Sequence, residues 1–229
     1  MKNIESQSVS KKVIEKIQTM IISGELAQGD KLPPERELTQ LLDVGRPALR
    51  EALKALELLG LIESRHGLGN YIVNNVNESY FKPMSIAFKL EKGTSQEILE
   101  MRQCLETYAV GRAAQNSTVD DIEILRDLLH KMIEGETPAE KAVIDRAFHF
   151  EIARISGNTL VYNTMKNISF LMDSFIEHSV QLSYFEGDSI ENIYKEHTSI
   201  INAIEKHDAK SAVETMEKHL EMIDVEKID

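Results

Sequence analysis

The sequence of 229 residues contains no tryptophan, one cysteine and few aromatic residues, 6% in total. It also has no run of about 18 apolar residues, the minimum for a membrane-spanning helix. The N-terminal residues MKNIESQSVSKK lack the apolar core of a secretion signal. Cys104, the single cysteine, cannot form an internal disulfide. We therefore expect a cytoplasmic protein with no membrane partner.

The composition is otherwise that of a globular protein, with 42% hydrophobic and 28% charged residues. The net charge is −12, but residues 1–75 contain ten basic and ten acidic residues, so the whole excess of negative charge lies in residues 76–229. A neutral N-terminal part can present basic side chains on one face, whereas phosphate would repel the acidic remainder. The charge distribution permits a nucleic-acid partner without indicating one.

The N-terminal part has the pattern of three helices followed by a hairpin. Apolar residues at helical spacing predict a helix over 9–23, a short helix over 34–43 and a third over 46–60. Two short β-type runs follow, 61–65 and 70–73, joined by a glycine-containing turn. This order is typical of a winged helix-turn-helix, which binds DNA.

In such a domain the third helix enters the major groove and its first turn carries the residues that contact bases. Arg46 and Arg50 occupy that turn, four residues apart and therefore on one face. Arg36 lies near the start of the second helix, where it can reach phosphate or the groove edge, and His66 lies at the tip of the wing. The alternative is that these arginines are simply solvated and that Arg50 pairs with a nearby glutamate.

The C-terminal part has no strand pattern, so we expect a mainly α protein whose second domain is an all-α antiparallel helical bundle. The boundary is predicted between domains 1–74 and 75–229, with a linker at about 74–78. Helices are expected over 94–115, 118–132, 137–155, 160–184, 189–206 and 209–225.

One carboxylate and three imidazoles are expected to point inward from this bundle. Asp145 and His149 are i,i+4 neighbours on one helix, and His197 and His219 lie within the apolar stripes of two others. Unpaired polar groups in an apolar interior are costly, and a divalent metal would give all four a shared partner. A set of three nitrogens and one oxygen suits Zn, Ni, Fe or Mn better than Ca or Mg. Alternatively, each histidine is an ordinary hydrogen-bonded core residue.

Arg102 and His178 are candidates for binding a small organic acid. Arg102 lies on the buried stripe of its helix, and a guanidinium can hold a carboxylate by two hydrogen bonds. His178 lies beside an apolar stripe of its helix and is expected to line the same cavity. The alternative for Arg102 is an ion pair with Glu106 in the same helix.

The segment KLPPERELTQLLDVGRPALREALKALELLGLIESRHGLGNYIV resembles the GntR-family winged helix. The resemblance covers about residues 9–74, and it implies DNA contacts by Arg36, Arg46, Arg50, His66 and Gly67. Two positions depart from the family pattern. Pro34 and Gly45 stand where the family usually has hydroxyl-bearing residues, so backbone N–H groups must replace contacts made by those hydroxyls.

Residues 79–226 resemble the FCD ligand-binding domain of the FadR subfamily. Its metal-binding members are similar in having Asp-x3-His on one helix and two later histidines, which correspond here to Asp145, His149, His197 and His219. The resemblance implies a regulator that binds a transition metal, zinc in first place, and an organic-acid effector. A homodimer is expected, because an operator with an inverted repeat has the same two-fold symmetry.

Three alternatives remain at this point. An open metal site could activate water in a hydrolase-like enzyme, although we find no further inward carboxylate to act as its base. The metal could be purely structural, or it could itself be the signal. We expect a regulator rather than an enzyme.

Overall fold

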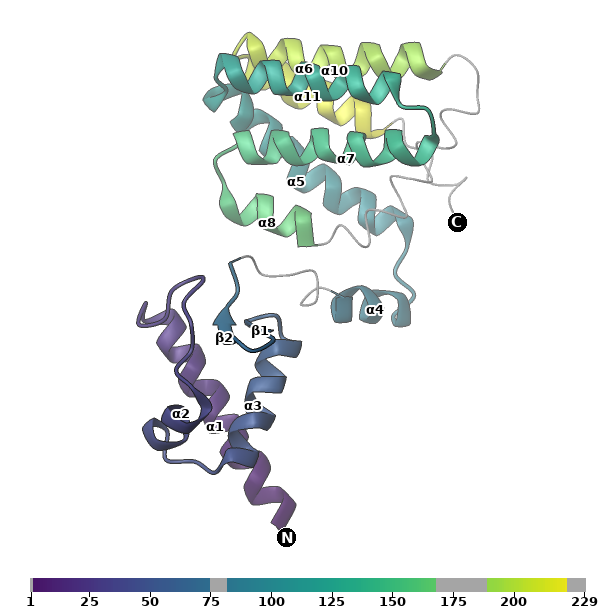
Figure 1. Cartoon of the computed structure of the whole chain (residues 1–229). Coiled ribbons are helices and arrows are strands. Elements are labelled where there is room, and N and C mark those ends of the chain that lie inside the picture. The colour runs from purple at the N-terminus through teal and green to yellow at the C-terminus, as the bar shows by residue number, and fades with distance from the viewer. Residues whose placement is uncertain (1, 75–81, 168–188, 222–229) are drawn as a thin grey trace. The chain divides into compact units, whose positions relative to one another are not determined.

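The computed structural model describes residues 2–74, 82–167 and 189–221 (Figure 1). The chain divides into two compact units, Met1–Met84 and Ser85–Asp229. The division falls within helix α4 (Lys82–Leu90), after the linker proposed from the sequence at 74–78. None of the helices in the described ranges is long and apolar enough to cross a membrane.

The first unit contains three helices and a two-stranded antiparallel hairpin, as predicted. Their bounds are α1 Lys2–Ile22, α2 Glu35–Leu41, α3 Arg46–Leu58, β1 Ile62–Arg65 and β2 Gly69–Ile72. Helix α1 begins at Lys2, earlier than the predicted start at residue 9.

The apolar faces of these elements form one small core. Helix α3 packs against α1, α2 and β1 and buries Leu49, Leu53 and Leu56. In the hairpin Ile62 pairs with Ile72, and both side chains are buried. Burying one side chain of this size stabilises the fold by about 1.5–3 kcal/mol. The helices and the wing therefore hold one another in place.

Seven helices, including α4, are described in the rest of the chain. Their bounds after α4 are α5 Ser95–Asn116, α6 Val119–Glu134, α7 Pro138–Ile155, α8 Thr159–Asn167, α10 Ser189–Glu205 and α11 Ala209–Glu221. Capping boxes at Thr94, Thr118 and Thr137 start α5, α6 and α7, within one residue of the predicted starts. The predicted continuation of the fourth helix from 168 to 184 lies outside the described residues, as does the end of the last helix.

Five of these helices form a closed ring. Helix α5 packs on α11 and α7, α7 packs on α6, α6 on α10, and α10 on α11 (Figure 1). The pairs α6–α7 and α10–α11 are joined by connections of a few residues, which makes them antiparallel neighbours. The all-α bundle predicted from the sequence is confirmed.

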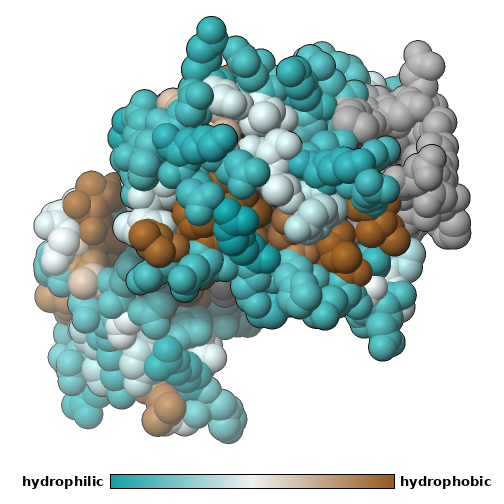
Figure 2. All heavy atoms as spheres, turned by 90° about the horizontal axis from the view of Figure 1, so that it is seen from above, coloured by the Kyte–Doolittle hydropathy of each residue, from teal (hydrophilic) through white to brown (hydrophobic). Residues whose placement is uncertain are grey.

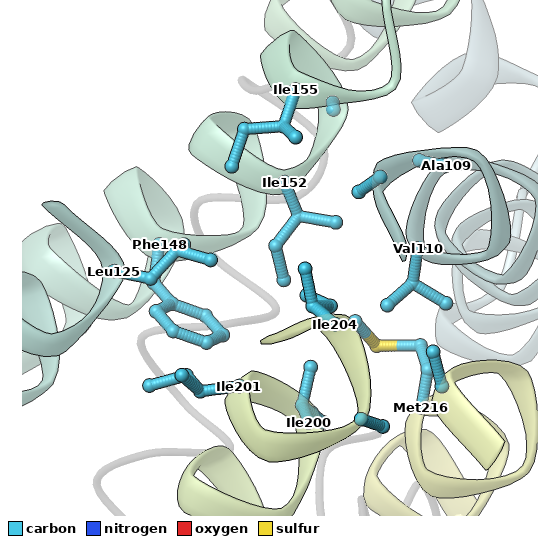
Figure 3. Packing of buried hydrophobic residues seen from close by; sticks show 14 of the residues in the cluster. Ala109, Val110, Leu125, Phe148, Ile152, Ile155, Ile200, Ile201, Ile204 and Met216 are labelled. Atoms are coloured by element: carbon cyan, nitrogen blue, oxygen red, sulfur yellow. The ribbon is translucent and has the colours of Figure 1, made fainter. Parts of the chain in front are cut away.

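The interior of the ring contains both apolar and polar side chains. Phe148 and Ile152 of α7 face Ile200, Ile201 and Ile204 of α10 in a closely packed cluster (Figure 3). Buried polar residues lie in the same bundle: Arg102, Glu106, Asp145, His149 and His197. The outer surface seen in Figure 2 is mostly hydrophilic, with hydrophobic side chains gathered in patches. The buried polar group is the feature that needs a functional explanation.

Candidate functional site

Helix α3 presents two arginines from its first turns. Leu49 and Leu53 anchor one face of α3 in the core, so Arg46 and Arg50 are exposed on the other side. Arg36 is exposed on α2, and His66 and Gly67 are exposed between the strands of the hairpin. Gly67 has φ +71°, a left-handed conformation that favours glycine and makes the tight tip possible. All five predicted DNA-contacting residues are therefore accessible.

Arg50 makes the ion pair that we considered as the alternative. Its Nε lies 2.9 Å from Oε2 of Glu35, and the Arg50 side chain is 66% exposed. An ion pair this exposed contributes about 0–1 kcal/mol, so a phosphate or a guanine edge can displace the carboxylate. The pair links Arg50 of α3 to Glu35 at the start of α2.

The two departures from the family pattern leave both helix starts without a side-chain cap. Pro34 and Gly45 occupy the N-cap positions of α2 and α3, and neither makes a side-chain capping hydrogen bond. No side chain at the N-cap therefore accepts a hydrogen bond from the first backbone N–H groups of these two helices. Backbone N–H groups at helix starts are natural partners for phosphate.

The second unit gathers four candidate metal ligands. Asp145 and His149 come from successive turns of α7, His197 from α10 and His219 from α11. The first three residues are buried, and the His219 side chain is 11% exposed. One ligand atom of each residue lies within 4.8 Å of the corresponding atom in every other. The structure thus brings together the four residues selected from the sequence.

The distances within this group suit a shared ion. Nε2 of His149 and Nε2 of His219 are 3.3 Å apart. Oδ1 of Asp145 lies 3.0 Å from Nε2 of His197 and 3.8 Å from Nε2 of His149. Two ligands that are each about 2.0–2.2 Å from one zinc ion lie roughly 3–4 Å apart.

The outward nitrogen of every imidazole faces an acceptor. Nδ1 of His197 lies 2.8 Å from the carbonyl oxygen of Ile193. Nδ1 of His219 lies 2.9 Å from Oε2 of Glu196, and Nδ1 of His149 lies 2.5 Å from Oε2 of Glu106. Carbonyl and carboxylate oxygens only accept, so each Nδ1 must carry the proton. In the neutral rings Nε2 is then a bare acceptor.

Burial and neighbouring groups keep Asp145 and His219 in the forms that bind metal. Burial would raise the pKa of Asp145, but His149, together with His197 and His219, lowers it below its usual range, so Asp145 is a carboxylate. Burial lowers the pKa of His219 to about 4, despite its hydrogen bond to Glu196, so this imidazole is neutral at neutral pH. A neutral imidazole and a carboxylate are the forms that coordinate metals.

Arg102 is fully buried and forms the ion pair with Glu106 that we considered from the sequence. Its Nε lies 2.7 Å from Oε1 of Glu106, and both side chains are at most 2% exposed. Nη2 of Arg102 is buried and has no hydrogen-bond partner among the described residues. The other candidate for effector binding, His178, lies outside the described residues.

Two acidic residues at the site were missed as its members by the sequence reasoning. Glu106 was considered only as a partner of Arg102, and Glu196 was not considered. The expectation that no further carboxylate points inward near the ligands was therefore wrong, because Glu106 is buried and contacts His149. Burial would raise the pKa of Glu106, but Arg102 and His149 outweigh it and lower the pKa to about 2. The i,i+4 spacing of Arg102 and Glu106 was visible in the sequence. The contacts with His149 and His219 cross between helices and left no sequence signal.

Comparisons with known proteins identify both units. Residues 9–72 match the family of bacterial regulatory proteins of the gntR family, and residues 97–222 match the FCD domain family. The solved structure of Streptococcus agalactiae GntR is similar, with a TM-score of 0.68 and 26% identity. The match covers 93% of this chain and 97% of that one.

Two curated relatives extend over nearly the whole chain. The HTH-type transcriptional regulator LutR of Bacillus subtilis is 34% identical over 88% of this chain and 93% of its own length. The putative L-lactate dehydrogenase operon regulatory protein of Escherichia coli K12 is 30% identical over 94% of this chain and 84% of its own. These relatives are regulators, so the hydrolase alternative is set aside. The chain belongs to the GntR family of transcriptional regulators, with a DNA-binding winged helix-turn-helix followed by an FCD domain.

Proposed function

We propose that the protein acts in the cytoplasm as a homodimer that binds an operator with a short inverted repeat. Arg46 and Arg50 contact bases, Arg36 contacts phosphate or the groove edge, and His66 and Gly67 approach the duplex from the wing. A dimer places two identical reading helices on two half-sites. Large apolar side chains are exposed on several helices of the second unit, among them Val119, Leu160 and Tyr194.

We further propose that Asp145, His149, His197 and His219 bind one divalent transition metal. The observation that carries this proposal is the direction of the hydrogen bonds. Each imidazole has an acceptor beside Nδ1, so the neutral rings with the proton on Nδ1 present three bare Nε2 atoms and one carboxylate oxygen to one another in a buried space. Four acceptors without a donor repel one another unless a cation lies among them. The donor set suits Zn, with Ni, Mn or Fe as alternatives.

The proposed effector is a small organic acid. Arg102 has a buried Nη2 without a partner among the described residues, one turn before the carboxylate that contacts His149. A carboxylate ligand would satisfy this N–H group, and a bound metal would supply a second positive charge for it. His178 is kept as a second candidate. One relative is named for the L-lactate dehydrogenase operon. L-Lactate, a 2-hydroxy carboxylate, is therefore the first acid to test.

The test is operator affinity measured by fluorescence anisotropy at fixed salt. The operator is first selected from genomic fragments by the purified protein. We expect L-lactate or a related acid to change the affinity of the metal-loaded protein and to have no effect after chelation. A change caused by the metal without any acid would make the metal the signal. Unchanged affinity in all four combinations would contradict both metal and effector control.

A further inference from the structure

Glu106 lies between the arginine and one of the candidate metal ligands, and it contacts both. Its Oε1 accepts from Nε of Arg102 at 2.7 Å, within helix α5. Its Oε2 lies 2.5 Å from Nδ1 of His149 on helix α7. Neither atom makes a hydrogen bond of regular geometry to a described residue, so this close ion-pair contact is the one contact that Oε2 of Glu106 and Nδ1 of His149 have there. One buried carboxylate therefore serves two donors from different helices.

We infer that Glu106 is a positioning residue that holds His149 with Nε2 free for a metal and fixes Arg102 with Nη2 free for a carboxylate ligand. The inference rests on the proposed metal and effector site and adds a residue that links its two halves. Glu106 itself contacts neither ligand. Its role is to leave Nε2 of His149 and Nη2 of Arg102 available.

A carboxylate is required at this position because both of its oxygens must accept. Arg102 can only donate, and His149 must donate from Nδ1 if its Nε2 is to bind a metal. The isosteric amide of glutamine has one oxygen and one NH2 group. If its oxygen faces Arg102, its NH2 faces Nδ1 of His149 and favours the opposite tautomer, in which Nε2 carries the proton. If its oxygen faces His149, its NH2 opposes a buried guanidinium.

Glu196 provides a matched control within the same site. It contacts His219 as Glu106 contacts His149, with 2.9 Å between Oε2 and Nδ1. Its side chain is 21% exposed, whereas that of Glu106 is 1% exposed. The described part of the chain offers it no second donor. The amide of Glu196→Gln can therefore turn its oxygen to His219 and its NH2 to water.

The first experiment compares zinc affinity of the full-length protein by competition with a chromophoric chelator. Loss of a hydrogen-bond partner outside the coordination sphere typically weakens metal binding by about 10–100-fold. We expect a loss of this size for Glu106→Gln and less than about threefold for Glu196→Gln. The double variant Arg102→Met/Glu106→Gln should recover affinity, since the amide oxygen is then free to face His149. Equal affinity of wild type and Glu106→Gln would overturn the inference.

The second experiment needs no metal and separates this inference from the proposed site. In metal-free protein with 15N-labelled histidine, NMR should show His149 protonated on Nδ1 in the wild type and shifted towards Nε2 in Glu106→Gln. If the wild type binds no zinc but this shift occurs, the metal proposal fails and the effect of Glu106 on His149 stands. If zinc binds and His149 keeps its tautomer in Glu106→Gln, the metal site stands and the role of Glu106 is wrong.

Discussion

At the scale of single residues, Arg46 and Arg50 are the side chains on which operator recognition is expected to depend. Both are exposed on α3, and the residues that fix the helix lie on its opposite face. We expect Arg46→Ala and Arg50→Ala each to weaken operator binding by about 1–3 kcal/mol, the value of one good contact with a base. Fluorescence anisotropy at fixed salt measures the loss, and thermal melting should show an intact fold.

Arg126→Ala is the matched control for these substitutions. Arg126 is also an exposed arginine in an ion pair, with Glu205, but it lies on α6 of the FCD domain. It should leave operator affinity unchanged. Normal affinity in the Arg46→Ala/Arg50→Ala double variant would remove α3 from the proposed interface.

His197 is the candidate ligand whose loss should reveal the metal most clearly. It is completely buried, and its Nε2 faces Asp145. A metal that binds only the folded state stabilises it by about 2.7 kcal/mol at a concentration one hundred times its Kd. Chelation should therefore lower the melting temperature of the wild type and barely change that of His197→Ala.

His130 supplies the control for the chelation experiment. Its side chain is 71% exposed, and its Nε2 lies 3.2 Å from Oε1 of Glu134 on the outside of α6. His130→Ala should keep the full effect of chelation. His207 is less suitable, since its Nδ1 lies 2.8 Å from the carbonyl oxygen of Ala114. A wild-type protein that gains no stability from Zn, Ni or Mn would contradict the metal site.

At the scale of the element, capping boxes at Thr94, Thr118 and Thr137 satisfy backbone N–H groups at the starts of three helices. The Thr118 hydroxyl accepts from the backbone N–H of Asp121, whose carboxylate accepts from the backbone N–H of Thr118. We expect Thr118→Ala to lower the free energy of unfolding by about 1 kcal/mol. Chemical denaturation of the metal-free protein measures the change.

Ser199→Ala is the corresponding control. Ser199 is exposed within α10, and its hydroxyl donates to the carbonyl of Lys195 in the preceding turn, so it caps no helix end. Its replacement should change the free energy of unfolding by less than about 0.5 kcal/mol. An equal loss in both variants would show that the Thr118 cap contributes nothing specific.

At the scale of the whole molecule, the two units have separate apolar cores. One contains residues from Val13 to Ile72 and the other residues from Leu99 to Leu220, with none in common. We expect segment 79–226 to fold when expressed alone, to remain dimeric or weakly associating and to keep its metal affinity. Circular dichroism should show a helical spectrum. A spectrum with substantial β content, or an unfolded chain, would contradict the independence of this unit.

The sequence by itself determined the features that depend on neighbours along the chain. The helix starts at Thr94, Thr118 and Thr137 follow from capping boxes, in which each threonine pairs with an acidic residue three positions later. The burial of His197 follows from the apolar stripe around it. The winged helix and the four candidate ligands were found in the same way, by spacing and by family resemblance. The linker and the roles of individual site residues stay predictions.

Only the tertiary structure decided which groups the buried side chains meet. From the sequence, Arg102 could either pair with Glu106 or bind an organic acid. In the structure its Nε donates to Glu106, and its Nη2 has no partner among the described residues. The contact between Glu106 and His149 joins α5 to α7, and the one between Glu196 and His219 joins α10 to α11. Helical periodicity predicts which face is buried, but the partner across the interface depends on how the ring of helices closes, and no single helix encodes that.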